Sequence, residues 1–247
     1  MYTCINCSQQ VEELYRRYSP SVLKVLKCSN CGNLADKYIE YDPVIVLLDL
    51  VLLEKQAYRH LLYNSTFKSY WKLMVVLLLS ESFRVWSNFG KHEVLEKIED
   101  KIEYNKNIGF EGEQSFYILL AHTGLSLGTF VLAVAVGTEL RWLSMGKKPK
   151  KYKVIDLFRA LVVGGSAKLL GLLSLVWRHV AQDLHYILIH GYTMLCLLTA
   201  YSVVCESGRI GSIIGLAFGL IAYNYVSSST LWFPPAMTNT TLLDKEI

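Results

Sequence analysis

The chain has 247 residues, of which 52% are hydrophobic and 19% are charged. Soluble domains carry about 25% charged residues, and the apolar residues here gather in the uncharged runs 114–138, 184–205 and 210–243. This composition excludes a purely soluble globular protein, a fibrous chain and a disordered one. The net charge of +4 is small and dispersed, so it indicates no nucleic-acid partner.

Four of the six cysteines lie near the N-terminus, at Cys4, Cys7, Cys28 and Cys31. Two C-x2-C pairs about 20 residues apart are typical of a zinc site. Two thiolates three positions apart can bind one ion, and a second pair completes a tetrahedral shell. A β-like stretch leads into the second pair, and Gly32 suits the tight turn that follows it. The sequence therefore predicts a small β-rich Cys4 zinc ribbon over residues 1–41.

Disulfides in an oxidising compartment and a redox-active C-x-x-C are the alternatives for these cysteines. The N-terminus has no basic region, apolar core or cleavage site of a secretory signal, and no βαβ pattern surrounds the cysteines. We therefore expect bound Zn2+. Four thiolates leave no position for water on the ion, so this zinc is predicted to hold the fold together rather than to catalyse a reaction.

The next segment begins with Asp42 and Pro43, the pattern of a helix N-cap followed by proline at the first helical position. The apolar block behind them, 44–53, is interrupted by Asp49 and is too short to cross a membrane. We predict that 42–64 forms an amphipathic helix at the headgroup boundary of a membrane. A buried helix of the zinc domain is the alternative.

Residues 65–238 are predicted to form a helical membrane bundle of three to five spans. The strongest candidates are uncharged and long enough to cross a hydrocarbon core of about 30 Å. The weaker candidates carry charges that must reach the interface or face a protein interior. The strong segments are 114–138, 184–205 and 210–228, and the weaker ones are 67–86 and 154–177.

Charge around the spans predicts their orientation. The loop 141–153 holds six positive charges and no acid, which favours the cytosol, whereas the acidic loop 88–113 can be luminal. Five spans then place the ribbon in the reducing cytosol, where zinc thiolates persist. The short tail 239–247 lies in the lumen, where Asn239 begins a possible glycosylation sequon.

Small and ionisable residues within the spans mark candidate contacts. Glycines at every fourth position let helices approach closely, although excess glycine is also ordinary in membrane sequences. Ionisable residues inside a bilayer are costly and are candidates for function. Asp156, Arg159 and His185 suit interfacial positions near span ends. The candidate lipid- or partner-facing residues are Lys168, His190, Gly211, Gly215 and Gly219.

Three motifs together resemble the homology domain of the Arv proteins. They are the C-x2-C…C-x2-C-G ribbon, the segment Tyr41-Asp-Pro-Val-Ile-Val-Leu-Leu-Asp49, and the box Lys55-Gln-Ala-Tyr-Arg-His-Leu-Leu-Tyr-Asn64. The resemblance covers about residues 1–64, where the motifs occur in this order. Beyond them it is a hydropathy pattern of several spans.

The resemblance implies a multi-pass endoplasmic reticulum protein without catalytic activity. It implies roles in intracellular sterol distribution, sphingolipid metabolism and early glycosylphosphatidylinositol (GPI) anchor synthesis, with sterol, GPI precursors and GPI-synthesis glycosyltransferase subunits as partners. The four ribbon cysteines become zinc ligands. An accessory scaffold of a glycosyltransferase complex, or an acyl- or glycosyltransferase itself, is the alternative. The implied functional surface comprises Gln56, Ala57, Tyr58, Arg59, His60 and Asn64.

Overall fold

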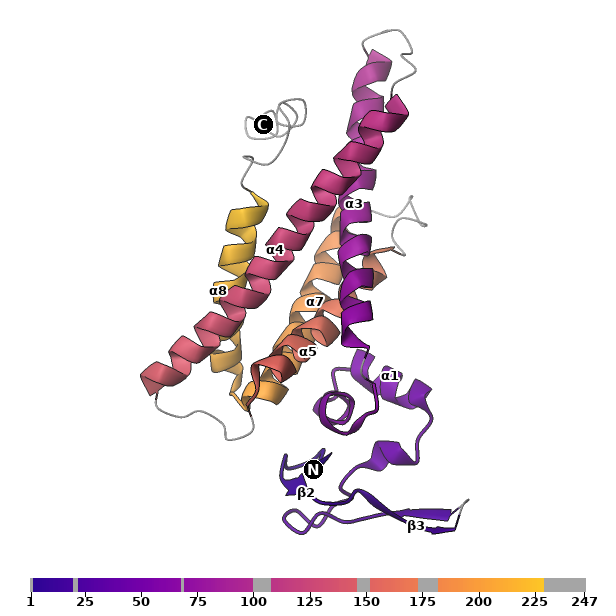
Figure 1. The fold of residues 1–247 in the computed structure, drawn as a ribbon, viewed down its shortest axis with the longest axis vertical. Coiled ribbons are helices and arrows are strands. Elements are labelled where there is room, and N and C mark those ends of the chain that lie inside the picture. Colours follow the sequence, from indigo (N-terminus) through magenta and orange to yellow (C-terminus); the bar gives the residue numbers. More distant parts are fainter. Residues whose placement is uncertain are drawn as a thin grey trace. The chain divides into compact units, whose positions relative to one another are not determined.

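The computed structural model describes residues 2–19, 22–67, 69–99, 108–145, 152–172 and 182–228; Figure 1 traces the elements in chain order. The chain divides into two compact units, and each is described by itself. The first unit comprises Met1–Trp71, Lys147–Ala167 and His190–Ile213, and the second comprises Lys72–Gly146, Lys168–Ile189 and Ile214–Ile247.

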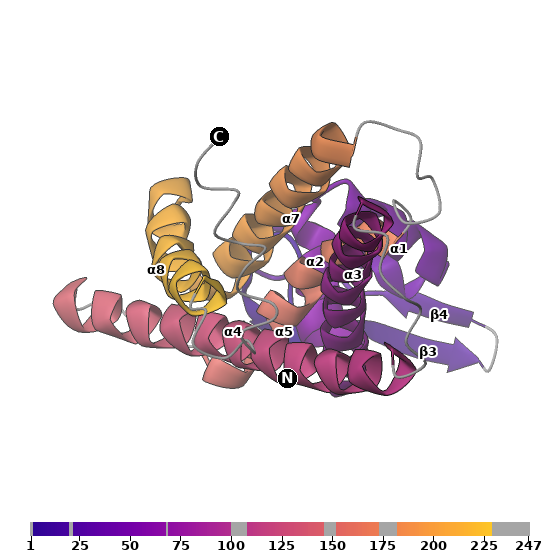
Figure 2. The same ribbon diagram turned by 90° about the horizontal axis from the view of Figure 1, so that it is seen from above.

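The N-terminal ribbon consists of two antiparallel hairpins. Strand β1 (Tyr2–Thr3) pairs with β2 (Gln10–Val11), and β3 (Tyr15–Ser19) pairs with β4 (Val22–Val25); Figure 2 shows the second hairpin clearly. Strand β4 confirms the β-like character predicted before the second cysteine pair. Two-stranded hairpins are marginal alone, so the ribbon depends on contacts outside its strands.

The segment behind the second cysteine pair is a short helical turn rather than a strand. This turn, η1 (Lys37–Ile39), is capped by Asp36, whose side chain accepts a hydrogen bond from the Tyr38 backbone N–H at 3.0 Å. Tyr38 is buried and packs with Ile5 and Ala57 in a small apolar core. The capped turn therefore directs Tyr38 into the first unit.

The predicted helix over 42–64 is interrupted. It comprises α1 (Pro43–Val51), α2 (Lys55–Arg59) and the π-helical turn η2 (His60–Asn64). Asp42 caps α1 as predicted, accepting from the Val44 N–H at 2.9 Å. The prediction of one continuous helix is wrong at Leu53, which adopts φ 62°, a left-handed conformation uncommon without glycine.

Two further helices complete the first unit. Helix α5 (Val154–Gly165) leads into the turn η3 (Ser166–Leu169). It packs on α7 (Gln182–Cys205), of which the part from His190 onward belongs to this unit. The packing is closest at Gly164, where an added Cβ would lie 2.9 Å from the Leu197 Cα and 3.2 Å from the Cys196 carbonyl oxygen. Because both neighbours are backbone atoms, only glycine fits there.

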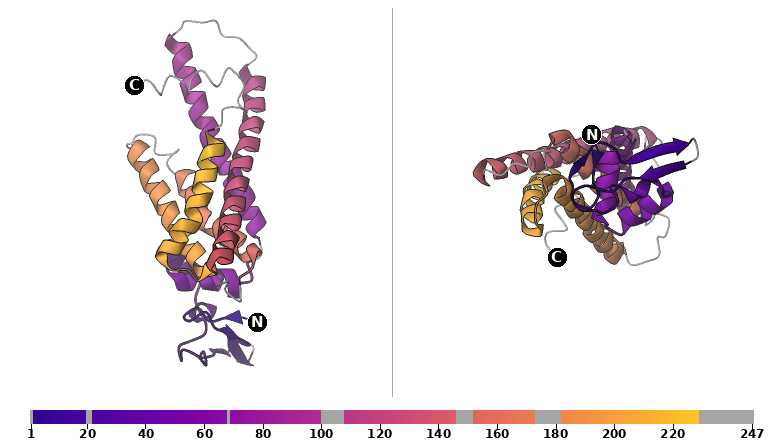
Figure 3. Two further views of the ribbon diagram at one scale, coloured as in Figure 1. Left: turned by 90° about the vertical axis from the view of Figure 1, so that its left-hand side faces the viewer. Right: turned by 90° about the horizontal axis from the view of Figure 1, so that it is seen from below.

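The second unit contains most of α3 (Tyr70–Glu99), α4 (Ile108–Met145) and the larger part of α8 (Arg209–Ser227). Helix α8 runs beside α4, as Figures 1 and 3 show. An added Cβ at Gly137 would lie 3.4 Å from the Phe218 Cβ. The segment 88–113 is not a loop where it is described, because α3 and α4 extend through it.

Within the described residues, three helices are long and apolar enough to cross a membrane: Phe116–Leu143, Ile187–Cys205 and Ile210–Ser227. They coincide with the three strongest predicted segments. Helices α3 and α5 lie in the two weaker segments, of which residues 173–177 are outside the described part of the chain, and neither helix meets the same length and hydropathy criteria. The protein is therefore a helical membrane protein.

Candidate metal centre and the helices docked on it

The four ribbon thiols converge on one point. The Sγ atoms of Cys4 and Cys31 are 3.8 Å apart, those of Cys7 and Cys28 are 3.7 Å apart, and all four lie within 4.8 Å of one another. A tetrahedron with Zn–S bonds of about 2.3 Å has edges of about 3.8 Å, whereas a disulfide measures about 2.05 Å. The cluster has the dimensions of a site for one tetrahedral ion and not those of two disulfides.

Two similar backbone turns present these thiols. The Cys4 carbonyl accepts from the Ser8 N–H at 3.0 Å, and the Cys28 carbonyl accepts from the Gly32 N–H at 2.9 Å. Ser8 and Gly32 both have positive φ, at 62° and 72°. The turn at Gly32 confirms the role predicted for that glycine. Ser8 takes the equivalent place in the first turn, which its residue type does not reveal.

The thiols have different proton affinities without an ion. Burial raises the pKa of Cys7, but hydrogen bonds from Asn30, Gln9 and the neighbouring thiols outweigh burial and bring this pKa to about 6. At Cys31 the Asn33 backbone hydrogen bond lowers the pKa, yet burial and the adjacent cysteines raise it to about 11. Thiolate charges crowded together repel, so a cation favours the fully deprotonated cluster.

Helix α2 is fixed to the first cysteine turn. The Arg59 Nη1 atom donates to the carbonyl oxygens of Ile5 at 2.7 Å and Asn6 at 2.8 Å. The Gln56 Nε2 atom donates to the Asn6 Oδ1 at 2.9 Å. Ile5 and Asn6 lie between Cys4 and Cys7, so the position of α2 and the shape of this turn depend on each other.

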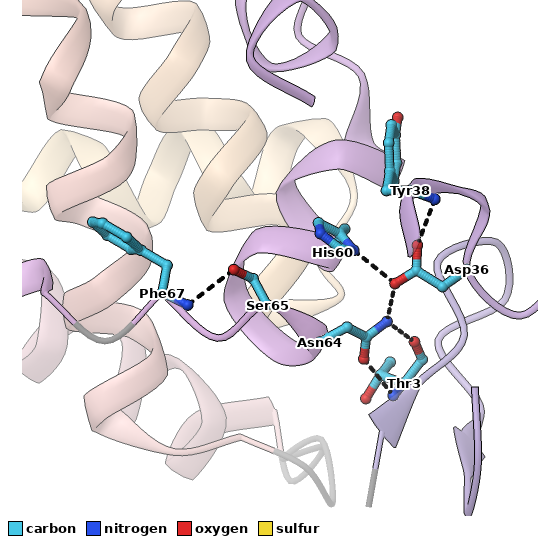
Figure 4. Close-up of polar contacts among 7 residues, drawn as sticks. All are labelled: Thr3, Asp36, Tyr38, His60, Asn64, Ser65 and Phe67. Atoms are coloured by element: carbon cyan, nitrogen blue, oxygen red, sulfur yellow. Dashed lines mark hydrogen bonds and ion pairs between the residues drawn. The ribbon is translucent and has the colours of Figure 1, made fainter. Parts of the chain in front are cut away.

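A buried carboxylate joins η2 to the ribbon, as Figure 4 shows. The Asp36 side chain is 0% exposed, and its Oδ2 lies 2.7 Å from the His60 Nδ1 and accepts from the Asn64 Nδ2 at 2.7 Å. Asn64 also accepts from the Thr3 N–H at 2.9 Å and donates to the Thr3 carbonyl at 2.8 Å. The contacts with His60 and Asn64 compensate for the burial of the Asp36 carboxylate, which would be costly without polar partners.

The opposite side of α2 and η2 meets α7 and the start of α5. Tyr58 is 2% exposed; burial, with Cys196 and Tyr192 beside the ring, raises its pKa. Burial and the charges of Asp156 and Glu206 likewise raise the pKa of Tyr63. Both phenols stay neutral at physiological pH. The short helices thus lie between the metal centre and a membrane helix of the same unit.

These contacts locate the predicted functional surface. Ala57 and Tyr58 are buried and the other four residues are partly buried, so none of the six is exposed. The surface is an internal joint between the ribbon and the membrane helices. Asp36, its central acceptor, was missed because a single aspartate in a polar stretch carries no distinguishing signal. The joint comprises Gln56, Ala57, Tyr58, Arg59, His60 and Asn64.

The predicted lipid- or partner-facing residues fall in different environments. Lys168 is partly buried, with its Nζ 3.4 Å from the Glu81 Oε1 and 5.3 Å from the Tyr223 ring. His190 is exposed. The Asn239 sequon lies outside the described residues.

The glycines predicted to face a lipid or partner are covered to different extents. Gly215 and Gly219 are buried, and Gly211 is half-buried. An added Cβ at Gly219 would meet Val134 and lie 3.0 Å from the Phe130 ring. At Gly219, the close approach that glycine allows is therefore made to α4 of the same chain.

The protein is therefore a helical membrane protein with an N-terminal ribbon that carries a four-thiol candidate metal centre. Short helices connect this ribbon to the membrane helices. A model of the Arv1-like family matches residues 3–201, and the chain belongs to this family.

Curated relatives match either most of the chain or about a third of it, and they carry ARV names. Human "Protein ARV1" is 32% identical over 221 residues, covering 89% of this chain and 78% of that protein. Candida albicans "Protein ARV1" is 29% identical over 264 residues, covering 92% and 88%. The Arabidopsis thaliana "Protein ARV 2" is 38% identical over 89 residues, covering 33% and 39%. No solved structure matches the chain.

Proposed function

We propose that this chain is a non-enzymatic protein of the endoplasmic reticulum membrane that maintains lipid homeostasis. Its role is to distribute sterol among membranes and to support sphingolipid metabolism and early GPI-anchor synthesis. Membership of the Arv1-like family, over residues 3–201, carries this proposal. The membrane helices support a lipid environment for the activity, and sterol and GPI precursors are the proposed ligands.

The proposed ion in the ribbon is Zn2+, with a structural role. Thiolate ligands suit zinc, and the sulfur separations of 3.7 and 3.8 Å suit its tetrahedral shell. Four protein ligands fill that shell and leave no coordination position open to water or substrate. The ion would therefore stabilise the fold rather than catalyse a reaction. Zinc would hold the Cys4 and Cys28 turns together, and through Arg59 and Gln56 it would fix the position of α2.

Complementation of cells that lack their own family member tests the proposed function. Expression of this chain is expected to restore intracellular sterol distribution and GPI-anchored proteins at the cell surface. The Cys28→Ser variant is expected to fail, because an incomplete shell releases the ribbon fold. The His190→Ala variant is expected to rescue fully, because its exposed side chain performs no chemistry.

Two results would contradict a non-enzymatic role. One is turnover of a lipid substrate by the purified, metal-loaded chain alone. The other is loss of rescue by His190→Ala at unchanged protein level. Cross-linking from the membrane separates lipid handling from scaffolding, since mainly lipid is expected in the first case. One stoichiometric glycosyltransferase subunit in the cross-linked product would favour a scaffold.

A further inference from the structure

Helix α1 presents its apolar stripe outward. Residues spaced three and four apart lie on one face of a helix, and such a stripe normally faces a protein core. Here that stripe is exposed, and none of the side chains of α1 is fully buried. The exposed fractions are 60% for Val44, 60% for Leu47, 56% for Leu48, 51% for Val51 and 71% for Leu52.

The single charge of α1 is directed away from this stripe. Asp49 accepts a hydrogen bond from the Tyr38 hydroxyl at 2.7 Å, and its carboxylate lies 3.7 Å from the Lys37 Nζ. Val46 and Leu50, on the same inner side, pack against the small apolar core of the ribbon. The charge that interrupts the apolar block in the sequence therefore does not interrupt the exposed stripe.

The last four carbonyl groups of α1 all have partners. The Leu48, Asp49 and Leu50 carbonyls accept from the N–H groups of residues 52, 54 and 53 at 2.9, 2.9 and 3.1 Å. The Val51 carbonyl accepts from the Tyr192 hydroxyl at 2.8 Å. A helix end normally leaves these carbonyls to water. In an apolar medium these carbonyl groups must form hydrogen bonds within the protein, as they do here.

The Tyr192 contact also identifies the neighbour of the stripe. Tyr192 lies within the candidate span Ile187–Cys205, so the C-terminal end of α1 adjoins a membrane helix of the same unit. Polar residues bound α1 at both ends, with Asp42 at its N-cap and the exposed Glu54 and Lys55 after its C-terminus. A helix with polar ends and one apolar face suits a position along the membrane surface.

We propose that α1 lies in the plane of the bilayer interface, with the stripe Val44, Leu47, Leu48, Val51 and Leu52 among lipid acyl chains. The ribbon and η1 cover the opposite face of this helix. Within the segment 42–64, the proposal assigns the lipid contact to α1 and not to α2 and η2, whose Ala57, Tyr58 and Leu62 are buried in the first unit. It requires a membrane protein but not the proposed role in lipid homeostasis.

Photo-cross-linking of the full chain in its native membrane tests this proposal. A photoreactive amino acid replaces Leu48 or Val44 on the stripe, or Leu34 on the ribbon as a matched control. Leu34 is also an exposed apolar residue, at 42%, but it does not belong to α1. Irradiation followed by mass spectrometry is expected to give phospholipid adducts at Leu48 and Val44, at least ten times more than at Leu34.

Equal lipid labelling at all three positions would overturn the proposal, as would a protein adduct as the main product at Leu48. Metal content and membrane extraction of each variant are measured in parallel, so that a misfolded chain is recognised. Fluorescence quenching by brominated phospholipids provides the second readout. A fluorophore at position 48 is expected to be quenched several-fold more strongly than one at position 34, and equal quenching would contradict the proposal.

Discussion

Asp36 is the residue on which the polar contacts of the ribbon joint converge. Its buried carboxylate receives hydrogen bonds from η1 and from two residues of η2, which are about 25 positions away in the sequence. Buried charged acceptors of this kind contribute more than neutral ones. Without this acceptor the partly buried His60 Nδ1 loses its Asp36 partner, and the Asn64 Nδ2 keeps only its hydrogen bond to the Thr3 carbonyl.

We expect the Asp36→Ala variant to destabilise the ribbon by about 3 kcal/mol or more. Proteolysis of the full chain in detergent measures this, because cleavage reports the population of the opened form. Cleavage within the ribbon should accelerate on the order of 100-fold. The control is Glu13→Ala, which removes an ion pair whose side chains are 61% and 67% exposed and should change cleavage little. Similar rates in the two variants would contradict the role of Asp36.

Arg59 connects the metal centre to α2 through the Ile5 and Asn6 carbonyls. Residues that support a ligand loop typically alter metal affinity 10- to 100-fold. The Arg59→Ala variant should therefore lose its ion to a competing chelator about ten times faster. A colorimetric chelator follows the release, with Arg16→Ala, which removes an exposed arginine, as the matched control. Release at the control rate would show that the turn is rigid without Arg59.

At the scale of the elements, the contact of α5 with α7 depends on Gly164. An added methyl group would press on the α7 backbone, with the Leu197 Cα only 2.9 Å away. Overpacking of this kind costs about 1–3 kcal/mol. Gly164→Ala should lower the thermal midpoint of the detergent-purified protein. Gly191→Ala, in α7 with no neighbour within 4 Å of an added Cβ, should not, and equal midpoints would contradict this packing.

Local sequence patterns predicted some of these elements but not the break between α1 and α2. The C-x2-C pairs, the Asp42–Pro43 cap and the long uncharged runs each have a local physical cause, and each predicted its element. The break at Leu53 has no such signal, because neither glycine nor proline stands there. It is stabilised by contacts on either side of it, including the Tyr192 hydrogen bond to Val51.

Tertiary contacts also determine the part of the site that sequence could not predict. The cysteine spacing indicates the metal ligands, but the pairing of Asp36 with His60 and Asn64 depends on a fold that brings η1 and η2 together. The sequence identified the segment from Gln56 to Asn64 by resemblance alone. Its inward orientation became evident only from burial.

For the whole molecule, the number of membrane crossings follows from which helix ends meet. The Tyr70 ring, at the start of α3, lies 5.4 Å from the Arg159 guanidinium, in the second turn of α5. A chain segment whose two ends meet on one side crosses an even number of times. Since α4 supplies one crossing, we expect α3 to supply the second; its 30 residues extend about 45 Å as a helix.

The same reasoning applies between α5 and α7. Asp156 at the start of α5 and Glu206 after α7 both raise the pKa of Tyr63. We therefore expect these two positions to lie on one side of the membrane, and α5 to begin a crossing that pairs with α7. Among the described side chains of α3, α5 and η3, Glu81 pairs with Arg84 at 2.8 Å and with Lys168 at 3.4 Å, and Asp156 pairs with Arg159 at 3.2 Å. Paired charges lower the cost of a position inside the membrane. Five crossings are therefore expected.

Glycosylation reporters test this topology. An acceptor sequence inserted between Asn105 and Lys106 is expected to be glycosylated, because five crossings with a cytosolic ribbon place the segment between α3 and α4 in the lumen. The same sequence inserted between Lys148 and Pro149 should remain unmodified. With only three crossings, the second insertion would be glycosylated and the first would not. That result would contradict the prediction of five crossings.

The central claim is a single ion held by four thiolates on the ribbon of a membrane protein. Native mass spectrometry of the full chain, released from detergent, tests it most directly. The account predicts one zinc ion per chain with all six cysteines reduced. A metal-free chain with Cys4, Cys7, Cys28 and Cys31 joined in two disulfides would contradict it.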